Sequence, residues 1–429
     1  MLNKVYENQI YILNKIKNFY KKNYFSSAYF CSYSNNLGFH IMNYWINKKN
    51  IKNFFYFFLK EIYSLLNMSD YVLESNYLIN QSYKRIFLTW GNDKNIISKE
   101  NKYYDKYFDI DNSDKFNLWI VIFKGKKRFN NENVILIKKK KLSFFRKLYN
   151  FFEFIFIQLK KKQISLHNLT SENFFSYKIN QILNKILKDN YSSKNIFIPF
   201  EAQPFQNELV ENIKINFKEK KIVGYIHSFP SFSPNLIKKK YSPDILISNS
   251  KNQIDFYCKH LDWNKNKLYY LPSLRFKKNS INIRKKKIYL PINFSSVSDI
   301  CSKTEYLASI YNLKEFEVIN HPEAYYSKQH NKLINNINNI INNKKYNKVN
   351  EIDFSIFIGS TSSIIESLSN GVKVIHLMEN PVFEIYSEEI WTNIKVHHIT
   401  KQIVKYVLLD ENIINLVEKN ALDQYLNID

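Results

Sequence analysis

A turn rich in hydroxyl groups, between a predicted strand at 354–358 and a predicted helix at 362–369, is the segment best suited to bind an anion. Backbone N–H groups and hydroxyls at the start of a helix bind phosphate or carboxylate groups. The alternative is that these residues only cap the helix. Gly359 and Gly371 bracket the helix, at a sharp turn and at a helix end, where glycine costs little. The hydroxyl-rich turn consists of Ser360, Thr361, Ser362 and Ser363.

A histidine follows the preceding predicted strand, one strand–helix unit earlier. His321 can hydrogen-bond a phosphate from this position, and Pro322 fixes the backbone beside it. The alternative is a simple exit from the strand. Glu366, one turn into the later helix, can reach a ligand hydroxyl, whereas glutamates inside helices usually face solvent.

Two candidates for acid–base chemistry follow predicted strands in the middle of the chain. The Glu201 carboxylate can take a proton from a substrate hydroxyl or hydrogen-bond substrate hydroxyls. Its alternative role is that of an ordinary carboxylate at a helix N-terminus. His227 can act as the base instead, or bind a phosphate or carboxylate. Gln203 and Ser228 lie beside these two residues in sequence and are expected to contact the same substrate.

An alternation of strands and helices from residue 195 onward is expected to position these residues. This alternation predicts parallel sheets, in which ligands bind beyond the carboxyl ends of the strands. Helices are expected near 300–312, 327–342 and 362–369. The predicted strands are 85–90, 118–123, 133–137, 196–199, 222–226, 245–248, 268–271, 288–291, 316–319, 354–358 and 372–377.

We therefore predict an α/β protein with two nucleotide-binding-type domains joined by a linker near 277–287. Residues 1–85 are expected to be mostly helical, and 91–115 to form a polar, Asp-rich loop. The predicted parts are an N-terminal domain at 1–284, a C-terminal domain at 285–400 and closing helices at 401–429.

Length and charge bound the possible functions. The chain has 429 residues, which suggests two or three domains, and its formal net charge is +25. The abundance of Lys, Asn, Ile, Phe and Tyr is typical of an AT-rich genome, so part of the lysine excess need not be functional. The functional alternative is attraction to anions. We expect no nucleic acid as a partner, because no recognised motif accompanies the charge.

The expected location is cytoplasmic. No secretory signal and no run of about 18 apolar residues is visible. Three cysteines without CxxC spacing fit a reducing compartment. In 138–163, lysine clusters flank an aromatic-rich core of helical length. This pattern predicts either a helix on an anionic membrane, peripheral at the inner face of the cytoplasmic membrane, or a helix buried on one side with solvated ends, which we favour.

The HP motif at His321 and the Ser-Ser/Thr motif of the hydroxyl-rich turn resemble a known family over about 288–380. The pair is similar to motifs of bacterial sialyltransferases, polysialyltransferases and the Kdo transferases of capsule synthesis. These are GT-B glycosyltransferases, with two Rossmann-like domains and a cleft between them, that use CMP-activated sugars. The resemblance implies that His321, Ser362 and Ser363 contact the nucleotide phosphate and ribose, with Pro322, Ser360 and Thr361 beside them. Glu366, one turn into the helix, can then reach a ribose hydroxyl.

A second resemblance covers 197–276. The segments FIPFEAQPFQNEL, VGYIHSFPSFSP, SPDILISNS and LPSLRF are similar to bacterial surface-carbohydrate biosynthesis proteins. Arg275, near the linker, can pair with a donor carboxylate or phosphate, or tie the domains together. Asp93 is a rival base to Glu201 and His227, because related sialyltransferases place an acidic-Gly motif in the N-terminal domain. This chain lacks the usual form of that motif.

The sequence thus predicts a glycosyltransferase that moves a sugar from a nucleotide donor to a glycan or glycolipid acceptor, bound in part by Gln203 and Ser228. The favoured donor is a CMP-activated 2-keto acid sugar of Kdo or sialic-acid type. No cofactor and no metal are predicted, since the chain has no DxD between strands, no HExxH and no Cys/His ligand set. The alternatives are a CDP-polyol phosphotransferase of teichoic-acid type, a basic protein that binds nucleic acid or anionic surfaces, and a non-catalytic scaffold.

Overall fold

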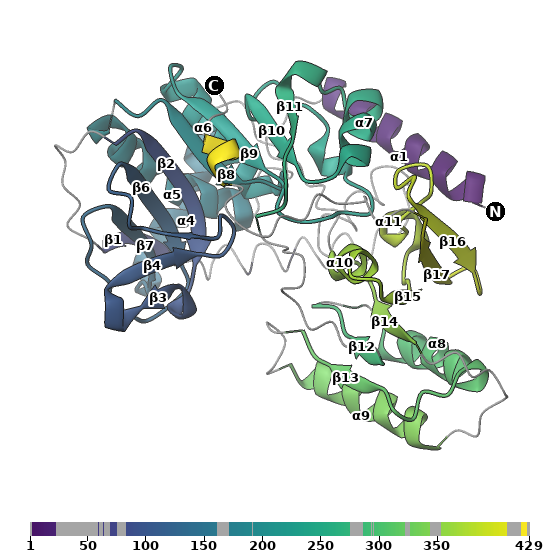
Figure 1. The fold of residues 1–429 in the computed structure, drawn as a ribbon. Coiled ribbons are helices and arrows are strands. Elements are labelled where there is room, and N and C mark those ends of the chain that lie inside the picture. The colour runs from purple at the N-terminus through teal and green to yellow at the C-terminus, as the bar shows by residue number, and fades with distance from the viewer. Residues whose placement is uncertain are drawn as a thin grey trace.

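Two sheets built from successive parts of the chain organise the protein, as the computed structural model shows (Figure 1). A small three-stranded sheet accompanies the first of them. The structure describes residues 2–22, 59, 63, 69–74, 83–160, 171–190, 192–274, 286–292, 294, 296–321, 327–343, 353–409 and 422–426.

The first sheet has the strand order β1-β7-β6-β2-β8-β9-β10-β11, and its neighbours are parallel except for β1 and β7. From β2 the chain builds outward through β6 and β7, then returns to the other side of β2 for the remaining strands. The order therefore reverses between β2 and β8, the point at which open α/β sheets bind ligands. The strands are β1 (Asp70–Glu74), β2 (Arg85–Gly91), β6 (Asn117–Phe123), β7 (Val134–Lys140), β8 (Asn195–Pro199), β9 (Lys221–Tyr225), β10 (Ile245–Ser248) and β11 (Leu268–Tyr270).

Both faces of this sheet are covered, so its strands are nearly continuous apolar runs. One face packs on helices α5 (Ser171–Asp189), α6 (Pro204–Asn216) and α7 (Lys251–His260). The other face contacts the small sheet, in which Tyr103 and Phe108 are buried. That sheet consists of β3 (Ile96–Ile97), β4 (Lys102–Asp105) and β5 (Ile110–Asp111).

The second sheet has the order β13-β12-β14-β15-β17-β16. Its first four strands are parallel, and β17 and β16 are added in antiparallel pairs. Helices α8 and α9 share a core with one face, and α10 packs on the other. The elements are β12 (Lys287–Tyr289), α8 (Val297–Ile310), β13 (Glu317–Ile319), α9 (Lys328–Asn343), β14 (Phe354–Ile358), α10 (Ser363–Ser369), β15 (Lys373–Leu377), α11 (Pro381–Glu384), β16 (Ile394–His398) and β17 (Ile403–Leu408).

Every predicted strand is present to within a few residues, and the α/β class with parallel sheets is confirmed. Three predictions were wrong. The expected polar loop at 91–115 contains β3, β4 and β5, because turn side chains hold these short strands; Asn112 Oδ1, for example, accepts from Tyr103 N at 2.8 Å. The expected closing helices at 401–429 begin instead with β17, in which β-branched Ile403, Val404 and Val407 favour a strand. Residues 70–74, expected in a helical region, form β1.

Both ends of the described chain connect the two sheets. Helix α1 (Leu2–Lys22) lies along α7 and α11 (Figure 1). Its Gln9 Nε2 donates to Val382 O at 2.9 Å, and its Tyr6 hydroxyl lies 2.9 Å from His260 Nε2. Helix α12 (Leu422–Leu426) follows the second sheet in sequence but packs on the first, where the Tyr425 ring lies 5.3 Å from that of Tyr225.

The first sheet spans 70–270 and the second 287–408, while most of the predicted linker falls outside the described residues. The boundary at 284 therefore stays a prediction. Among the described helices, none has the length and apolar character needed to cross a membrane.

Candidate functional site

A carboxylate and an imidazole meet at the carboxyl edge of the first sheet. Glu201 follows β8 and His227 follows the neighbouring strand β9. Glu201 Oε1 lies 3.3 Å from His227 Nε2, and the two side chains are 16% and 12% exposed. The pair is thus largely desolvated but still reaches the surface. Such a pair can remove a proton from a hydroxyl, with one member as the base and the other as its positioning group.

The loop that carries Glu201 is fixed by its own backbone. Ala202 adopts a left-handed conformation, with φ at 53°. The side chain of Gln206 closes the loop, since its Oε1 accepts from Glu201 N at 2.8 Å and Gln203 N at 3.1 Å, while its Nε2 donates to Pro199 O at 2.9 Å. Gln203 is the residue that precedes the first turn of α6. It is partly exposed and follows Glu201 by two residues.

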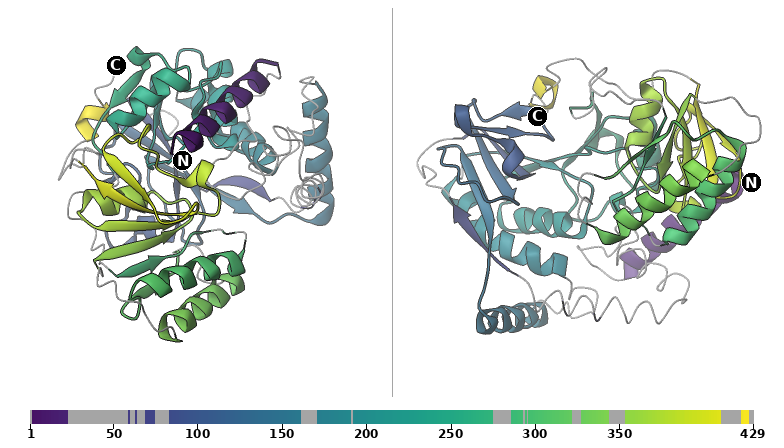
Figure 2. Two further views of the ribbon diagram at one scale, coloured as in Figure 1. Left: turned by 90° about the vertical axis from the view of Figure 1, so that its right-hand side faces the viewer. Right: turned by 90° about the horizontal axis from the view of Figure 1, so that it is seen from below.

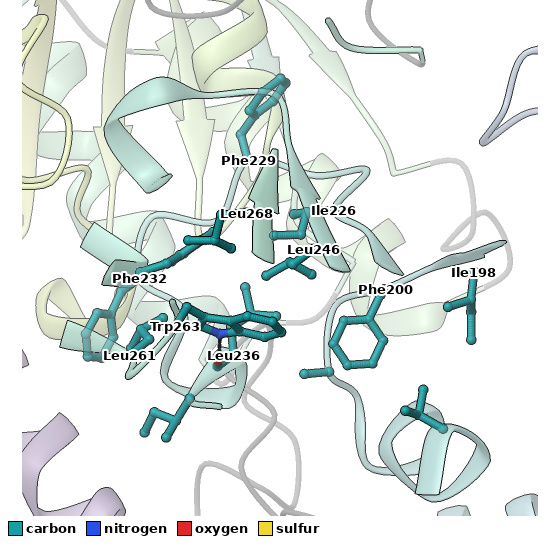
Figure 3. Close-up of a cluster of buried hydrophobic side chains, with 14 of the residues drawn as sticks. Ile198, Phe200, Ile226, Phe229, Phe232, Leu236, Leu246, Leu261, Trp263 and Leu268 are labelled. Carbon is teal, nitrogen blue, oxygen red and sulfur yellow. Dashed lines mark hydrogen bonds between the residues drawn. The ribbon is translucent and has the colours of Figure 1, made fainter. Parts of the chain in front are cut away.

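Apolar neighbours anchor both strand ends in the core. Phe200 precedes Glu201, and Ile226 and Phe229 flank His227; all three are buried in one cluster with Leu246 and Trp263 (Figure 3). Moving the carboxylate or the imidazole would require these side chains to leave the core, which resists such shifts because it is close-packed.

A buried aspartate supports His227 through a tyrosine. The ring of Tyr107 lies edge to face with the imidazole, with the centroids 4.6 Å apart. The backbone N of Tyr107 donates to Asp105 Oδ1 at 2.8 Å, and Asp105 Oδ2 accepts from the hydroxyls of Thr89 at 2.7 Å and Tyr103 at 2.9 Å. Burial raises the pKa of the Asp105 carboxyl in spite of these hydrogen bonds. The small sheet thereby fixes one wall of the site.

The hydroxyl-rich turn of the second sheet touches the loop that carries His227. Phe229 N donates to Ser362 Oγ at 3.0 Å. The Tyr386 hydroxyl shares its single hydrogen between two carbonyl oxygens, Phe229 O at 2.8 Å and Thr361 O at 2.9 Å. These bonds join two segments that follow the carboxyl ends of β9 and β14, so the predicted sites of the two halves form one region.

A buried histidine holds the start of the turn. His376 Nε2 lies 2.8 Å from Gly359 O, and its Nδ1 lies 3.1 Å from the Tyr406 hydroxyl. Tyr406 in turn accepts from Tyr386 N at 3.1 Å. Burial lowers the pKa of His376 to about 4, so the ring is neutral and donates to the glycine carbonyl. Gly359 itself has φ at +68°, a backbone conformation that favours glycine.

The four hydroxyls of the turn differ in their hydrogen bonding. Ser362 Oγ is engaged by Phe229, and Thr361 Oγ1 accepts from Ser363 N at 3.3 Å. Helix α10 spans only seven residues, and the bond to Thr361 already satisfies one backbone N–H of its first turn. The hydroxyls of Ser360 and Ser363 are partly exposed and make no hydrogen bond with other described residues. They are the two members of the turn best placed to bind a ligand.

Glu366 does not face solvent, which overturns that alternative. The residue is 3% exposed on the inner side of α10. Burial raises the pKa of Tyr289, and the negative charge of Glu366 raises it further, so the carboxylate lies near this tyrosine. The Tyr289 ring stacks on Phe357 with the centroids 4.6 Å apart. Contact of Glu366 with a ribose stays a prediction.

The remaining second-half candidates are only partly described. His321 is half-buried beyond β13, and β12 separates that strand from β14 and its turn. With strands spaced about 4.8 Å apart, the ends of β13 and β14 are separated by roughly 10 Å. A ligand that contacts both must be longer than a single phosphate. Pro322 and Arg275 lie outside the described residues.

Asp93, the rival base, is engaged in holding a loop. Its Oδ1 accepts from Lys126 N at 2.9 Å and from Lys127 N at 2.8 Å. These two backbone hydrogen bonds lower the pKa of the Asp93 carboxyl. A Cβ at Gly125 would collide with the carboxylate, so glycine permits this close approach. A carboxylate with a lowered pKa is a poor proton acceptor.

Three polar residues at the same edge are buried. The Ser228 and Ser250 hydroxyls and Asn249 Oδ1 have no hydrogen-bond partner among the described residues. The predicted contact of Ser228 with the acceptor therefore requires some movement of the loop. Asn249 and Ser250 directly follow β10, so the strand-end rule could have found them, but the sequence analysis used their segment only for its resemblance. No local sequence pattern pointed to a role for Tyr107, Tyr386 or His376.

The part of the chain that the structure describes contains no group of three or more His, Cys, Asp or Glu residues able to hold a metal. The candidate residues that the structure describes include the Glu201–His227 pair, the hydroxyls of the turn and His321. These groups suit proton transfer and the binding of a polar, anionic ligand.

Replacing Tyr386 with phenylalanine tests the connection between the two halves. The variant removes the hydroxyl that bonds both the Phe229 and the Thr361 carbonyl, while Thr361 O keeps a 3.4 Å bond from Ile364 N, so we expect the free energy of unfolding to fall by about 0.5–1.5 kcal/mol. Urea unfolding measures this change. Tyr306→Phe, at an exposed position on α8, is the matched control and should differ from wild type by less than about 0.5 kcal/mol. Equal stability of all three proteins would contradict the assignment.

The buried imidazole of His376 predicts a pH dependence. Its pKa is about 4 in the folded protein against an ordinary value of 6.5, so between these pH values the unfolded chain binds a proton that the folded chain refuses. Stability from this group is present above pH 6.5 and is lost as the pH falls to 4, by an amount on the order of 3 kcal/mol. We expect His376→Gln to lack this loss.

The measurement is the difference in unfolding free energy between wild type and His376→Gln, followed by urea titration from pH 7 to pH 4. Glu384, whose pKa is raised to about 8 by burial, contributes to both proteins and cancels in the difference. A difference that stays constant with pH would rule out a neutral, buried His376.

No protein-family model matches the chain, and comparison with curated proteins finds no match. Inferences about function therefore rest on the site and on the motifs themselves.

Proposed function

We propose that the chain is a metal-independent glycosyltransferase of the GT-B type. It moves a sugar from a nucleotide donor, preferably a CMP-activated 2-keto acid sugar, to a glycan or glycolipid acceptor. The observation that carries this proposal is the contact between the Phe229 segment and the hydroxyl-rich turn, which brings the Glu201–His227 pair and the turn into one region.

The arrangement of the sheets supports a two-part reaction. Each half places its polar residues beyond the carboxyl ends of parallel strands, where such sheets bind ligands. The first half contributes groups for proton transfer and the second contributes hydroxyls and a histidine. A transferase needs this division, since one substrate carries the leaving phosphate and the other supplies the attacking hydroxyl.

The donor binds the second half in this proposal. Ser360 and Ser363 hydrogen-bond the phosphate, and His321 contacts the donor from the end of β13. The roughly 10 Å between the ends of β13 and β14 matches a nucleotide better than a free phosphate. Hydrogen bonds to the phosphate stabilise the negative charge that develops on it as the bond to the sugar breaks.

The acceptor binds the first half, next to Gln203. The acceptor hydroxyl oxygen attacks the sugar carbon, the bond from that carbon to the nucleotide phosphate breaks, and Glu201 takes the hydroxyl proton. His227, 3.3 Å away, positions the Glu201 carboxylate. The reverse assignment has His227 as the base. Asp93 is the weakest of the three candidates because its hydrogen bonds lower its pKa.

Thermal stabilisation by nucleotides tests donor binding. CMP, CDP, UMP, UDP, GDP and ADP are each added to purified protein without metal. A nucleotide at 100 times its Kd contributes roughly 2.7 kcal/mol, and we expect CMP to give the largest shift. The double variant Ser360→Ala/Ser363→Ala and the single variant His321→Ala should lose this shift. Ser369→Ala, at the far end of α10, should keep it.

Other outcomes of the stabilisation experiment favour the alternative functions. Transfer of polyol phosphate from a CDP-polyol also releases CMP, so release of CMP from CDP-glycerol and not from a CMP-linked sugar favours the polyol phosphotransferase. A preference for UDP or GDP discards the CMP-linked donor. No response to any nucleotide, together with salt-dependent binding of DNA or RNA, assigns the charge to nucleic-acid binding and contradicts the proposal.

Replacement of the pair tests the chemistry. In Glu201→Gln we expect CMP release from CMP-sialic acid or CMP-Kdo, with glycan acceptors present, to fall by about 10²- to 10⁴-fold. The stabilisation by CMP should persist, because the donor binds elsewhere. Glu132→Gln, an exposed carboxylate, is the control. If His227→Gln loses more activity than Glu201→Gln, the histidine is the base; full activity in both variants would exclude the pair.

A further inference from the structure

Helix α4 (Phe144–Lys160) has two apolar faces, of which one is packed. On that side Phe154 is buried, and its ring lies 5.3 Å from that of Phe174 on α5. Lys178 of α5 donates to Asn150 Oδ1 at 3.2 Å and to Glu153 Oε2 at 3.3 Å. These contacts fix which side of α4 faces the protein.

The opposite face of α4 is apolar and exposed. Its side chains recur at intervals of three, four or seven residues, so they form one stripe along the helix. Both views of Figure 2 place this helix at the edge of the molecule. The stripe consists of Phe145, Tyr149, Phe152, Phe156 and Leu159, which are between 51% and 82% exposed, with Phe144 beside it at 69%.

A surface helix of a globular protein normally turns its polar side outward. Here the outward side is aromatic, and the acidic residue of α4, Glu153, belongs to the packed side with Lys178. The expectation of a helix buried on one side with solvated ends therefore explains the Phe154 face but not the other. An exposed aromatic stripe of this length marks an interaction surface.

Positive charge lies at the N-terminal end of the stripe. Lys139 and Lys140 at the end of β7 and Lys141 after it are exposed, and so is Arg146 in the first turn of α4. The Arg146 guanidinium lies 5.1 Å from the centre of the Tyr149 ring. Aromatic side chains flanked by basic groups match the two layers of a bilayer surface, where rings enter the acyl boundary and cations meet anionic head groups.

We propose that α4 docks the protein on an anionic lipid surface through this stripe. The helix lies on the bilayer and does not cross it, in keeping with the absence of a membrane-crossing helix among the described residues. A second copy of the chain is a poorer occupant, since it would bring the same basic groups together in a protein with net charge +25. This inference is independent of the proposed transferase activity.

Co-sedimentation of the purified full chain with lipid vesicles tests the proposal. We expect binding to phosphatidylcholine vesicles that contain phosphatidylglycerol, and much weaker binding to phosphatidylcholine alone. The triple variant Phe145→Ser/Phe152→Ser/Phe156→Ser should bind about tenfold more weakly, because interfacial binding scales with buried apolar area. The matched control, Phe116→Ser/Ile215→Ser/Tyr306→Ser, removes three exposed apolar side chains elsewhere and should bind like wild type.

A conservative variant keeps the test decisive if the triple variant folds poorly. Tyr149→Trp should fold normally, and its added fluorescence should shift to the blue with anionic vesicles and not with neutral ones. Lys139→Gln/Lys140→Gln/Lys141→Gln should weaken binding most at low salt.

Two outcomes would overturn the proposal. One is equal vesicle binding by the stripe variant and the control. The other is no binding to anionic vesicles; a dimer of wild type that the stripe variant abolishes, measured by light scattering, would then assign the face to a second copy.

Discussion

One buried side chain connects the two halves of the site, because the Tyr386 hydroxyl contacts both of them. It donates to Phe229 O, beside the His227 loop, and to Thr361 O, in the hydroxyl-rich turn. Tyr386 itself is fully buried, where an unpaired hydroxyl is costly. Together with the bond from Phe229 N to Ser362 Oγ, these contacts hold the loop after β9 against the hydroxyl-rich turn.

The apolar contacts around this tyrosine hold the halves together without fixing their alignment. One continuous buried cluster contains residues of both sheets, and across it the Phe232 and Phe383 rings lie 5.8 Å apart. Apolar burial is strong but non-directional, whereas hydrogen bonds have fixed geometry. The connected groups Tyr386, Tyr406 and His376 therefore specify the alignment, and burial keeps the imidazole among them neutral.

Much of the fold could be predicted from the sequence because buried parallel strands are short apolar runs, such as Leu118–Phe123. The strand-end rule then found Glu201, His227 and the serines, because it depends only on local sequence. It could not find Tyr386, whose role comes from a contact across 157 positions of the chain, or Asp105, which lies in a short strand that the apolar pattern does not reveal. The small sheet was missed for a similar reason, since its strands of two to four residues are held by turn hydrogen bonds and not by an apolar pattern.

Asp93 and Glu201 show what the strand-end rule leaves open. They follow β2 and β8, neighbours at the point where the strand order reverses, so position alone makes them equal candidates for a base. Their surroundings differ, because backbone N–H groups satisfy the Asp93 carboxylate and favour its charged form, while the Glu201 carboxylate lies 3.3 Å from the His227 imidazole. A carboxylate whose negative charge is stabilised holds backbone N–H groups more firmly, and it accepts a proton less readily. Strand topology therefore selects the candidates, and the hydrogen-bond donors around each carboxylate decide between a structural and a chemical role.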